Sequence, residues 1–458
     1  MRADRSDRWD GAGGGQLADA GGWGISSEVV WPRLSLQRAG VSLIDCDHRT
    51  PPAASDGFPY IAIPQLKDGH VDLNGVRRIA PSDYVDWTRK LKPRANDVIV
   101  VRRCNSGDSA VVPQGLECAI GQNLVVLRST GSAVEPRFLR WLVRGPDWWD
   151  QVAKFINVGA VFDSLRCKDI PNFELTVPPI DAQQEIAALL DSLDDRIALL
   201  RETNTTLEAI AQALFKSWFV DFDPVRAKIA GRAPEGMDEA TATLFPESFA
   251  ESEFGLVPKG WTPGLLGDVV RTVKSQLRPS ELRDVMNYVG LEHVPRKSLS
   301  LISWDTAGGL ESAKAKFSEG DVLFGRLRPY FHKVVVAPFD GVCSTDILVC
   351  QSKQRSYYGF VAFHLFSAEL IAYASRLSNG AKMPRIGWSD IAAYPLIIPS
   401  EQTASAYTQV VSPLLNRMKA NVFQAETLTT LRDTLLPRLI SGQLRLPEVK
   451  DAADKALA

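Results

Sequence analysis

Apolar positions recur most regularly in two long segments, one near the middle of the chain and one near its end. In both, the spacing alternates between four and three residues, which is typical of a coiled-coil heptad. The first seam is Ile186, Leu190, Leu193, Ile197, Leu200, Asn204, Leu207, Ala211, Leu214 and Trp218. The second seam is Tyr407, Val411, Leu414, Met418, Asn421, Ala425, Leu428, Arg432, Leu435 and Leu439, in which Arg432 is the one awkward member. The pattern predicts coiled-coil helices over residues 181–220 and 400–442.

Residues at the helix ends fit these limits. Asp181 and Ser400 are expected to act as N-caps, because their side-chain oxygens can accept hydrogen bonds from the unpaired N–H groups of a first turn. Gly442 is expected to stop the second helix, and the first is expected to fray just after residue 220.

The two helices belong to an internal repeat. Residues 96–100 lead into Arg102, and residues 320–324 lead into Arg326 in the same way, 224 positions later. Further matches join 123–126 to 346–349, Gly159-Ala160 to Gly380-Ala381 and Pro178 to Pro399, with offsets of 223, 221 and 221. A near-constant offset over many short matches indicates a tandem duplication. Short β-type runs punctuated by Gly and Pro precede each helix, so the fold class is mixed α/β with two duplicated units, 28–180 and 261–399.

Three other segments complete the predicted organisation. Residues 1–27 are rich in Gly, Asp and Arg without an apolar period, which predicts a disordered extension. Residues 221–260 carry Pro, Gly and acidic residues and are interpreted as a linker with little fold of its own. Residues 443–458 are a C-terminal tail.

One asparagine interrupts each apolar seam. If the helices lie antiparallel and the repeat's pseudo-twofold axis relates them, their midpoints near residues 202 and 423 coincide, and Asn204 falls opposite Asn421. A buried contact between two asparagines would fix the register of the pair at some cost in stability. The alternative is a polar residue tolerated at a partly exposed turn of each helix.

Composition places the chain among soluble globular proteins. It has 458 residues, 45% of them hydrophobic and 23% charged, and this length suggests about three folding units. No apolar run approaches the ~18 residues of a membrane span, and acidic residues occupy the N-terminus where a signal peptide needs an apolar core. We therefore expect a cytoplasmic protein with no membrane contact.

The net charge of −2 is unevenly distributed. Residues 28–177 carry a net charge of +2 and residues 261–399 carry +4, whereas residues 178–260 carry −8. A polyanionic partner would therefore meet two mildly basic units joined by an acidic spacer. Small imbalances of this kind are also typical of ordinary solvated surface.

No catalytic or metal-binding motif was found. A phosphate-binding loop, a dinucleotide fingerprint, a His-Glu-x-x-His motif, a nucleophile elbow and the base-holding loop of amino-methyltransferases are all missing from the sequence. The six cysteines form no Cys-x-x-Cys pair, and the five histidines are scattered with none at metal-ligand spacing. We therefore expect neither a metal nor a cofactor, and the duplicated units suggest a scaffold that presents two binding surfaces.

Several runs resemble the specificity subunit of type I restriction–modification enzymes. They are Gln183-Gln184-Glu185-Ile186-Ala187, Leu193-Asp194-Asp195-Arg196-Ile197, residues 213–225, residues 320–330, Cys343-Ser344-Thr345-Asp346 and the ending Leu435-Leu436-Pro437-Arg438-Leu439-Ile440-Ser441-Gly442. The resemblance covers nearly everything after residue 28. It departs from the family pattern in the N-terminal extension and in the first unit, where residues 102–107 replace the Gly-Arg-Leu-Arg-Pro-Tyr pattern of the second.

The resemblance implies a non-catalytic DNA-binding subunit. Each globular unit would be a target-recognition domain that recognises one half of a split double-stranded DNA sequence, and the helices would hold the two domains apart. The chain would recruit two methyltransferase subunits, which use S-adenosylmethionine, and two ATP-driven restriction subunits. The rival hypothesis is a scaffold or adaptor that keeps the duplicated fold without recognising DNA; the missing motifs argue against a fused nuclease–methyltransferase.

Eight residues are candidates for DNA contact. Arg and Lys bind phosphates, while Arg to guanine and Asn to adenine recognise base edges. The candidates are Arg102, Arg103 and Asn105 in the first unit and Arg326, Arg328, Lys333, Lys382 and Arg385 in the second. The alternative for each is a surface salt bridge or a solvated loop charge.

Overall fold

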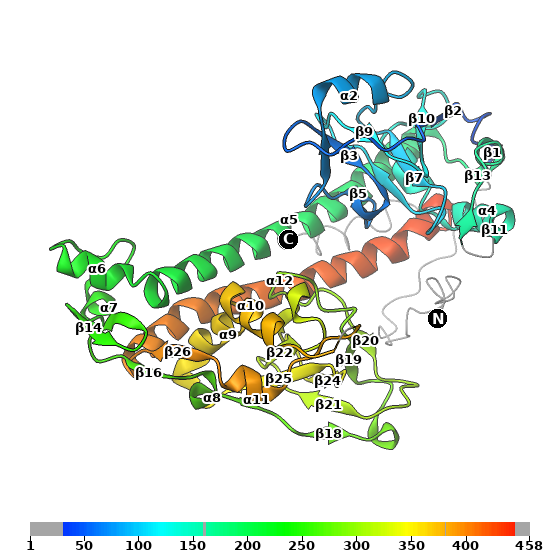
Figure 1. The fold of residues 1–458 in the computed structure, drawn as a ribbon. Coiled ribbons are helices and arrows are strands. Elements are labelled where there is room, and N and C mark those ends of the chain that lie inside the picture. The colour runs from blue at the N-terminus through cyan, green and yellow to red at the C-terminus, as the bar shows by residue number, and fades with distance from the viewer. Residues whose placement is uncertain (1–30, 159–161, 381, 445–458) are drawn as a thin grey trace. The chain divides into compact units, whose positions relative to one another are not determined.

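The structure is a computed structural model that describes residues 31–158, 162–380 and 382–444. The chain divides into two compact units (Figure 1). Unit 1 comprises Met1–Ser192 with Leu431–Ala458, and unit 2 comprises Leu193–Thr430. The boundary does not fall in a loop: it cuts both long helices, so each unit contains part of each helix.

The two predicted helices are present and continuous. They are α5 (Ile180–Phe219) and α12 (Glu401–Ile440), each 40 residues long. Ser400 caps α12, since its hydroxyl oxygen accepts from the N–H of Thr403 at 3.2 Å. Asp181 is not an N-cap, because α5 starts one residue earlier at Ile180, directly after two prolines, and places Asp181 in the first turn. Gly442 follows α12 with a φ of 81°, a conformation that favours glycine.

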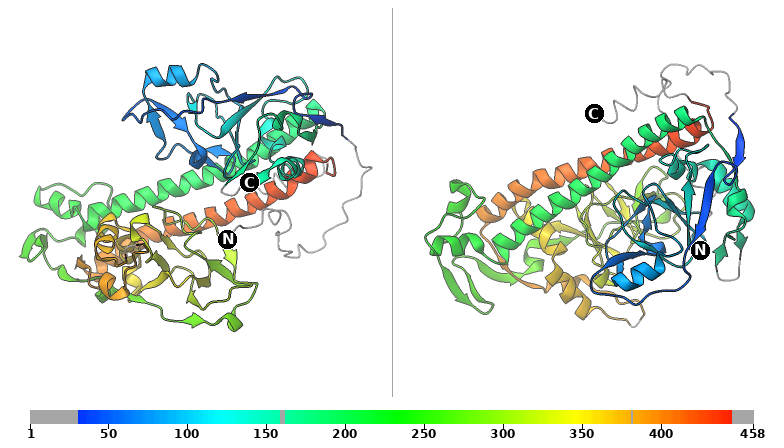
Figure 2. Two further views of the ribbon diagram at one scale, coloured as in Figure 1. Left: turned by 45° about the vertical axis from the view of Figure 1, so that its right-hand side comes forward. Right: turned by 90° about the horizontal axis from the view of Figure 1, so that it is seen from above.

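The predicted seams form the buried stripes of these helices. Eight of the ten residues of the first seam and nine of the ten of the second are buried, and Leu207, Leu214 and Leu414 are partly exposed. Within unit 2 the helices run antiparallel and side by side, as Figure 2 shows. Tyr407 donates its hydroxyl to the carbonyl of Ala211 at 2.9 Å, which ties the two helices together near one end of this stretch. The awkward member, Arg432, is buried and bonds Asp433 at 2.8 Å.

The globular part of unit 1 is built on small, mostly antiparallel sheets. Its central sheet has the order β2 (Val41–Asp45), β10 (Leu124–Ser129), β7 (Val98–Val101), β8 (Ser109–Val111). Beside it lie β6 (Arg77–Ile79), β3 (Phe58–Ile61) and β9 (Ala119–Ile120), of which β3 and β9 are parallel. The remaining elements are β1 (Arg33–Ser35) with β13 (Glu174–Thr176), β4 (Leu66–Lys67) with β5 (His70–Val71), β11 (Asn157–Val158) with β12 (Asp163–Ser164), and helices α2 (Pro81–Trp87), α3 (Leu139–Leu142) and α4 (Pro146–Phe155).

The globular part of unit 2 repeats this plan. Its four-stranded sheet has the order β17 (Val270–Thr272), β25 (Ile347–Ser352), β22 (Val322–Gly325), β23 (Val334–Val336). The second sheet is β18 (Gln276–Leu277), β21 (Lys314–Phe317), β24 (Gly341–Cys343), β19 (Asn287–Val289), β20 (Asp305–Thr306), with β19 and β24 parallel. The other elements are β16 (Thr262–Leu265) with β26 (Pro395–Ile398), and helices α8 (Leu266–Val269), α9 (Tyr358–Phe366), α10 (Ala368–Leu377) and α11 (Trp388–Ala392).

The duplication is therefore structural as well as sequential. Strand β22 starts 224 residues after β7, and β25 starts 223 residues after β10, which are the offsets of the sequence repeat. In both units the same four strands pair in the same order, and a parallel pair stands beside them. The predicted mixed α/β fold with two duplicated units and two long antiparallel helices is confirmed.

The interpretation of residues 221–260 as a linker with little fold is wrong. This segment forms helices α6 (Asp223–Ile229) and α7 (Glu239–Thr243) and the hairpin β14 (Phe249–Ser252) with β15 (Gly255–Pro258). Some of its apolar residues are anchors: Val225 and Phe245 are almost fully buried, and the Phe245 ring meets Trp218 of α5 edge-on at 5.1 Å. The Pro, Gly and acidic residues of the segment conceal this fold, because two or three buried side chains suffice to fix it.

No single helix of the described residues is long and apolar enough to cross a membrane. One bent pair, Arg355–Phe366 with Ala368–Leu377, meets the length and composition test jointly, with a bend of 58°. Most of its apolar side chains belong to the core of unit 2, as Phe360, Phe363 and Leu370 illustrate.

Candidate nucleic-acid interface

In unit 1, the strand before the candidate residues Arg102 and Arg103 ends where three backbone segments meet. Strand β7 ends at Val101, and Arg102 then donates its N–H to the carbonyl of Asn123 at 2.8 Å. The carbonyl of Arg102 in turn accepts from the N–H of Leu165 at 2.8 Å. Three segments that are distant in sequence thus meet at Arg102.

Unit 2 contains the same junction. Arg326 donates its N–H to the carbonyl of Asp346 at 2.9 Å, and its own carbonyl accepts from the N–H of Ile386 at 3.1 Å. These three residues follow their counterparts in unit 1 by 224, 223 and 221 positions. The duplication therefore preserves this junction bond by bond.

Both arginine side chains reinforce the junction. Arg102 donates from Nη1 to the carbonyl of Leu165 at 3.4 Å, and Arg326 donates from Nε to the carbonyl of Ile386 at 3.1 Å. Each guanidinium thus holds the segment that returns after the Gly-Ala loop of its own unit. Both side chains are only partly exposed, and each already donates a hydrogen bond to the protein. Fewer of their N–H groups therefore remain for the predicted contact with DNA.

Arg328 performs a similar task for the second loop of unit 2. Its backbone adopts a left-handed conformation (φ 49°, ψ 62°), and its N–H bonds the carbonyl of Pro384 at 2.7 Å. Its guanidinium reaches the carbonyl of Lys382 at 3.0 Å. The loop after β22 and the segment 382–385 are therefore fastened to each other.

Arg385 forms a forked ion pair. Its Nε lies 2.9 Å from Oδ1 of Asp346 and its Nη2 lies 3.3 Å from Oδ2. The arginine side chain is nevertheless 48% exposed. Because two parallel hydrogen bonds fix its plane, Arg385 is held in one orientation at the surface.

The fastened loops expose a cation beside apolar and aromatic groups. Lys382 is exposed, and Tyr330 and Met383 are 53% and 51% exposed. Large exposed side chains of this kind next to a lysine are suited to contact a nucleic acid, where the cation meets phosphate and the ring meets a base or sugar. We call Tyr330, Lys382, Met383 and Arg385 the unit 2 patch.

Lys333 lies apart from this patch. Its ammonium donates to the carbonyl of Leu291, and partial burial, with the nearby charge of Arg296, lowers its pKa. His332, next to it, is buried and hydrogen-bonds the carbonyl of Phe366 at 2.8 Å. Both side chains therefore serve the fold at this position.

The corresponding region of unit 1 is exposed. Arg103 and Asn105 are exposed, and Cys104 and Asn105 have φ values of 54° and 79°, so the chain turns sharply there. Arg103 pairs with Ser164 as an isolated bridge, and Leu327 pairs with Arg385 in the matching way in unit 2. The first Gly-Ala loop, residues 159–161, lies outside the described residues.

The structure brings the two seam asparagines together within unit 2. Asn421 donates from Nδ2 to Oδ1 of Asn204 at 2.8 Å, and both residues are buried. Asn204 also donates to the carbonyl of Met418 at 3.0 Å and lies 3.4 Å from the hydroxyl of Ser300 in the globular part of the unit. The pair thus joins α5, α12 and the loop before β20.

A buried carboxylate occupies equivalent positions in the two units but has different partners. Asp97 accepts two hydrogen bonds from Arg128, of 2.8 and 2.6 Å. In unit 2 its counterpart, Asp321, meets Gln351, whose amide donates to it at 2.8 Å. Burial raises the pKa of Asp321.

Asp321 also lines a cavity of about 500 Å³ within unit 2, large enough for a small ligand.

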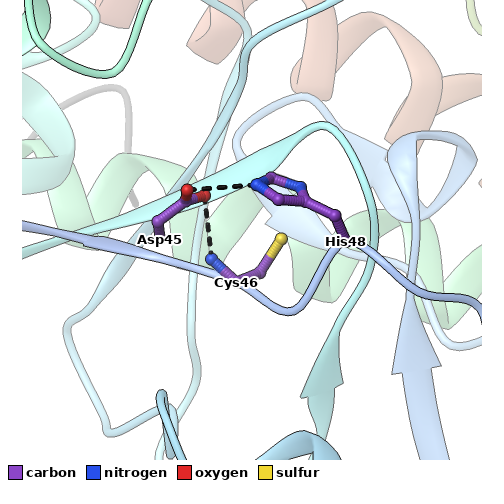
Figure 3. A group of neighbouring side chains, drawn as sticks. All are labelled: Asp45, Cys46 and His48. Atoms are coloured by element: carbon purple, nitrogen blue, oxygen red, sulfur yellow. Dashed lines mark hydrogen bonds and ion pairs between the residues drawn. The ribbon is translucent and has the colours of Figure 1, made fainter.

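One histidine lies beside other potential metal ligands, although the sequence predicted none at metal-ligand spacing. The ligand atoms of Asp45, Cys46 and His48 lie within 4.8 Å of one another, as Figure 3 shows. The spacing Asp-Cys-x-His was visible in the sequence, but it is too short to match a known motif. Only the end of β2 at Asp45 turns the three side chains toward each other.

Comparison with known proteins gives a consistent result. The family profile described as "Type I restriction modification DNA specificity domain" matches residues 49–209. The chain is 26% identical over 386 residues to the type I restriction enzyme MjaIX specificity subunit of Methanocaldococcus jannaschii, covering 82% of this chain and 83% of that one. It is 25% identical to the HindI specificity subunit of Haemophilus influenzae, covering 71% and 81%.

A solved structure has the same fold. The S subunit of a type I restriction–modification system from M. genitalium aligns with a TM-score of 0.51 and 14% identity, covering 91% of this chain and 97% of that chain. At this level of identity the likeness concerns the fold alone. It agrees with the duplicated architecture described above.

Proposed function

Since the chain belongs to the family of type I restriction–modification specificity subunits, we propose that it is the DNA-recognising subunit of such a complex. The observation that carries the proposal is the repeated junction at Arg102 and Arg326, which supports exposed loops at equivalent places in both units. The junction is the same in both units, whereas the loops that it supports differ in sequence. A protein that recognises two different half-sequences requires such an arrangement. Each unit recognises one half of a bipartite double-stranded DNA target.

The candidate residues divide by what their side chains already do. Lys382, Arg103 and Asn105 are exposed and Arg385 is held in a fixed plane, so these four are proposed to touch DNA directly. The list of positioning residues is Arg102, Arg326, Arg328 and Lys333, each of which donates to a backbone carbonyl. This division refines the set proposed from the sequence.

The partners follow from the family. The chain assembles with methyltransferase subunits, which supply S-adenosylmethionine chemistry, and with ATP-driven restriction subunits, two of each in the full complex. The long helices α5 and α12 provide the docking surface for them, and the complex acts on DNA in the cytoplasm. The chain itself performs no catalytic step.

Methylation sequencing tests this function directly. The chain is co-expressed with its methyltransferase subunit in a host without adenine methylation, and methylated adenines are mapped. One split motif with a constant gap is expected, and the chain alone should leave the DNA unmethylated. Absence of any motif, together with DNA binding that depends on neither salt nor sequence, would favour the adaptor hypothesis.

Exchange of one globular domain tests whether the two domains recognise their half-sequences independently. Strands β16 and β26 pair with each other, so the two ends of the segment 261–399 lie side by side and can both be cut there. Replacing this segment with that of a relative should change one half of the methylated motif and leave the other half and the gap intact. A change in both halves would contradict the division of labour.

A further inference from the structure

The group at the end of β2 combines three kinds of metal ligand. Asp45 is the last residue of the strand, and Cys46 and His48 follow in the loop. The carboxylate of Asp45 lies 3.1 Å from Nε2 of His48 and accepts from the N–H of Cys46 at 3.0 Å. Figure 3 shows the imidazole, the carboxylate and the sulfur of Cys46 gathered on one side of the loop.

A fourth ligand comes from a distant part of unit 1. Burial and the nearby carboxylate of Asp45 raise the pKa of the Cys167 thiol, so the two side chains are neighbours although 122 residues separate them in sequence. Cys167 follows the segment that Arg102 holds through Leu165. Cys167 is not among the three residues whose ligand atoms lie within 4.8 Å of one another, so its sulfur must move closer to complete a set of two sulfurs, one imidazole nitrogen and one carboxylate oxygen.

We propose that Asp45, Cys46, His48 and Cys167 bind one structural Zn²⁺ ion. Zinc takes four ligands drawn from Cys, His and Asp, and it accepts this mixture of sulfur, nitrogen and oxygen more readily than Mg²⁺ or Ca²⁺, which require oxygen. Ligand atoms of a tetrahedral zinc site stand roughly 3.5 Å apart, so the group within 4.8 Å must contract by about an ångström. A loop residue such as His48 can make that movement.

The surroundings suit a ligand set with excess negative charge. Two thiolates and one carboxylate around Zn²⁺ leave a net charge of −1. The positive charge of Arg102 acts on both Cys46 and Cys167, and the ammonium of Lys90 lies 4.0 Å from Asp45. On binding, each thiol releases its proton to solvent as its sulfur bonds the metal, and Cys46 gives up its hydrogen bond to the carbonyl of Gly121.

The site is specific to unit 1. Following the strand registers, Lys274 and Ser275 occupy the places of Asp45 and Cys46 in unit 2, and Trp388 occupies that of Cys167. The duplicated scaffold therefore does not require the ligand set. Zinc would fasten the end of β2 to the segment that carries Leu165, and so would brace the junction below the exposed loops of unit 1.

Metal content of the purified full chain tests the proposal. The chain is stripped with a chelator, and binding of Zn²⁺ is measured by competition with a chromophoric chelator and by elemental analysis. Co²⁺ serves as a spectroscopic substitute, because thiolate coordination gives a charge-transfer absorption. We expect one ion per chain, a cobalt–thiolate band and a higher melting temperature of the zinc form.

His48→Gln is the key variant, because the His48 side chain is 52% exposed and its replacement does not disturb the core. It should weaken zinc binding by more than the roughly 10–100-fold that loss of an outer hydrogen-bond partner costs. The matched control is His293→Gln, which also removes a histidine beside an aspartate, Asp305, but lies in unit 2 and should leave binding unchanged.

Cys167→Ser then tests the fourth ligand and should reduce both affinity and the cobalt–thiolate band. The proposal is overturned if the folded wild-type chain binds no zinc above the level of His48→Gln, or if both histidine variants bind equally. Neither result depends on DNA recognition, so failure here would leave the proposed function standing.

Discussion

Asn421 donates a hydrogen bond of 2.8 Å to the side-chain oxygen of Asn204, across the two long helices of unit 2. The two residues were paired from the sequence by the symmetry of the repeat alone. Asn204 accepts this bond and directs its own amide Nδ2 to Met418 and Ser300, so one amide links both helices to the globular part of the unit. The oxygen of Asn421, in contrast, is buried without a hydrogen-bond partner among the described residues.

Single and double replacements should separate stability from register at this pair. Asn204→Leu alone should lower the free energy of unfolding by about 1–3 kcal/mol, because it leaves the buried amide of Asn421 unpaired. The double variant Asn204→Leu with Asn421→Leu should recover most of this loss, since two apolar side chains pack without unsatisfied groups. Chemical denaturation measures both values.

The register role has its own measurement. In the double variant a cysteine pair placed across α5 and α12 should crosslink in more than one alignment, whereas the parent helices should give one crosslinked product. A single product in the double variant would show that the asparagines do not set the register.

The positioning and contacting residues of unit 2 should respond differently to substitution. Lys382→Ala removes an exposed charge and should weaken binding of all DNA sequences, with a salt slope smaller by about 1 and an unchanged motif. Arg326→Ala removes the side-chain hydrogen bond to the carbonyl of Ile386 and should relax the preference at the unit 2 half-site only. Arg326→Lys should restore that preference in part, since an ammonium can still donate to the carbonyl. Binding titrations at several salt concentrations measure the affinity, and methylation sequencing measures the preference. If Arg326→Ala weakened the binding of all DNA sequences equally, Arg326 would be a contacting residue like Lys382.

The buried acid of unit 2 predicts a pH dependence. Because burial raises the pKa of Asp321, the folded unit favours the protonated form, and this stability is complete below the unfolded pKa of about 4 and is lost as pH rises through the folded pKa. Gln351→Arg copies the Asp97–Arg128 pair of unit 1 and should stabilise the carboxylate. We expect on the order of 1 kcal/mol more stability at neutral pH and a smaller gain near pH 4. Denaturation at both pH values checks this, and an equal gain at both would assign it to packing.

The sequence was most informative where one physical constraint acts along a regular spacing. The heptad seams predicted the ends of α5 and α12 to within two residues. A helix that buries a continuous stripe must place apolar residues at regular spacing, and this spacing is visible in the sequence. The offsets located the junction residues Arg102 and Arg326, but they could not reveal that both guanidinium groups bond a carbonyl some 60 residues away. Contacts of that kind depend on loop paths, which leave no period in the sequence.

Isolated anchors were missed for the same reason. Val225 and Phe245 fix the supposed linker through tertiary contacts, and Cys167 is brought near Asp45 by the tertiary fold. Nothing in the local sequence around either site signals the partner. The mixed composition of residues 221–260 even argues in the opposite direction.

The last prediction concerns the distance between the two recognised half-sequences. Each long helix has 40 residues and is about 60 Å long at ~1.5 Å per residue. If the helices set the gap, both must be lengthened together to keep the seam in register. The register of Asn204 with Asn421 places the point after Ala198 opposite the point after Glu426. Inserting one heptad at each of these points keeps every buried position buried.

This paired insertion should lengthen the gap in the methylated motif by about three base pairs, because seven residues add ~10.5 Å of helix and each base pair spans ~3.4 Å. The half-sequences should not change, since neither recognition domain is altered. A four-residue insertion after Ala198 alone shifts the seam of one helix against the other and should abolish methylation. Methylation sequencing distinguishes these results, and an unaltered gap in the folded heptad variant would show that the helices do not determine the spacing.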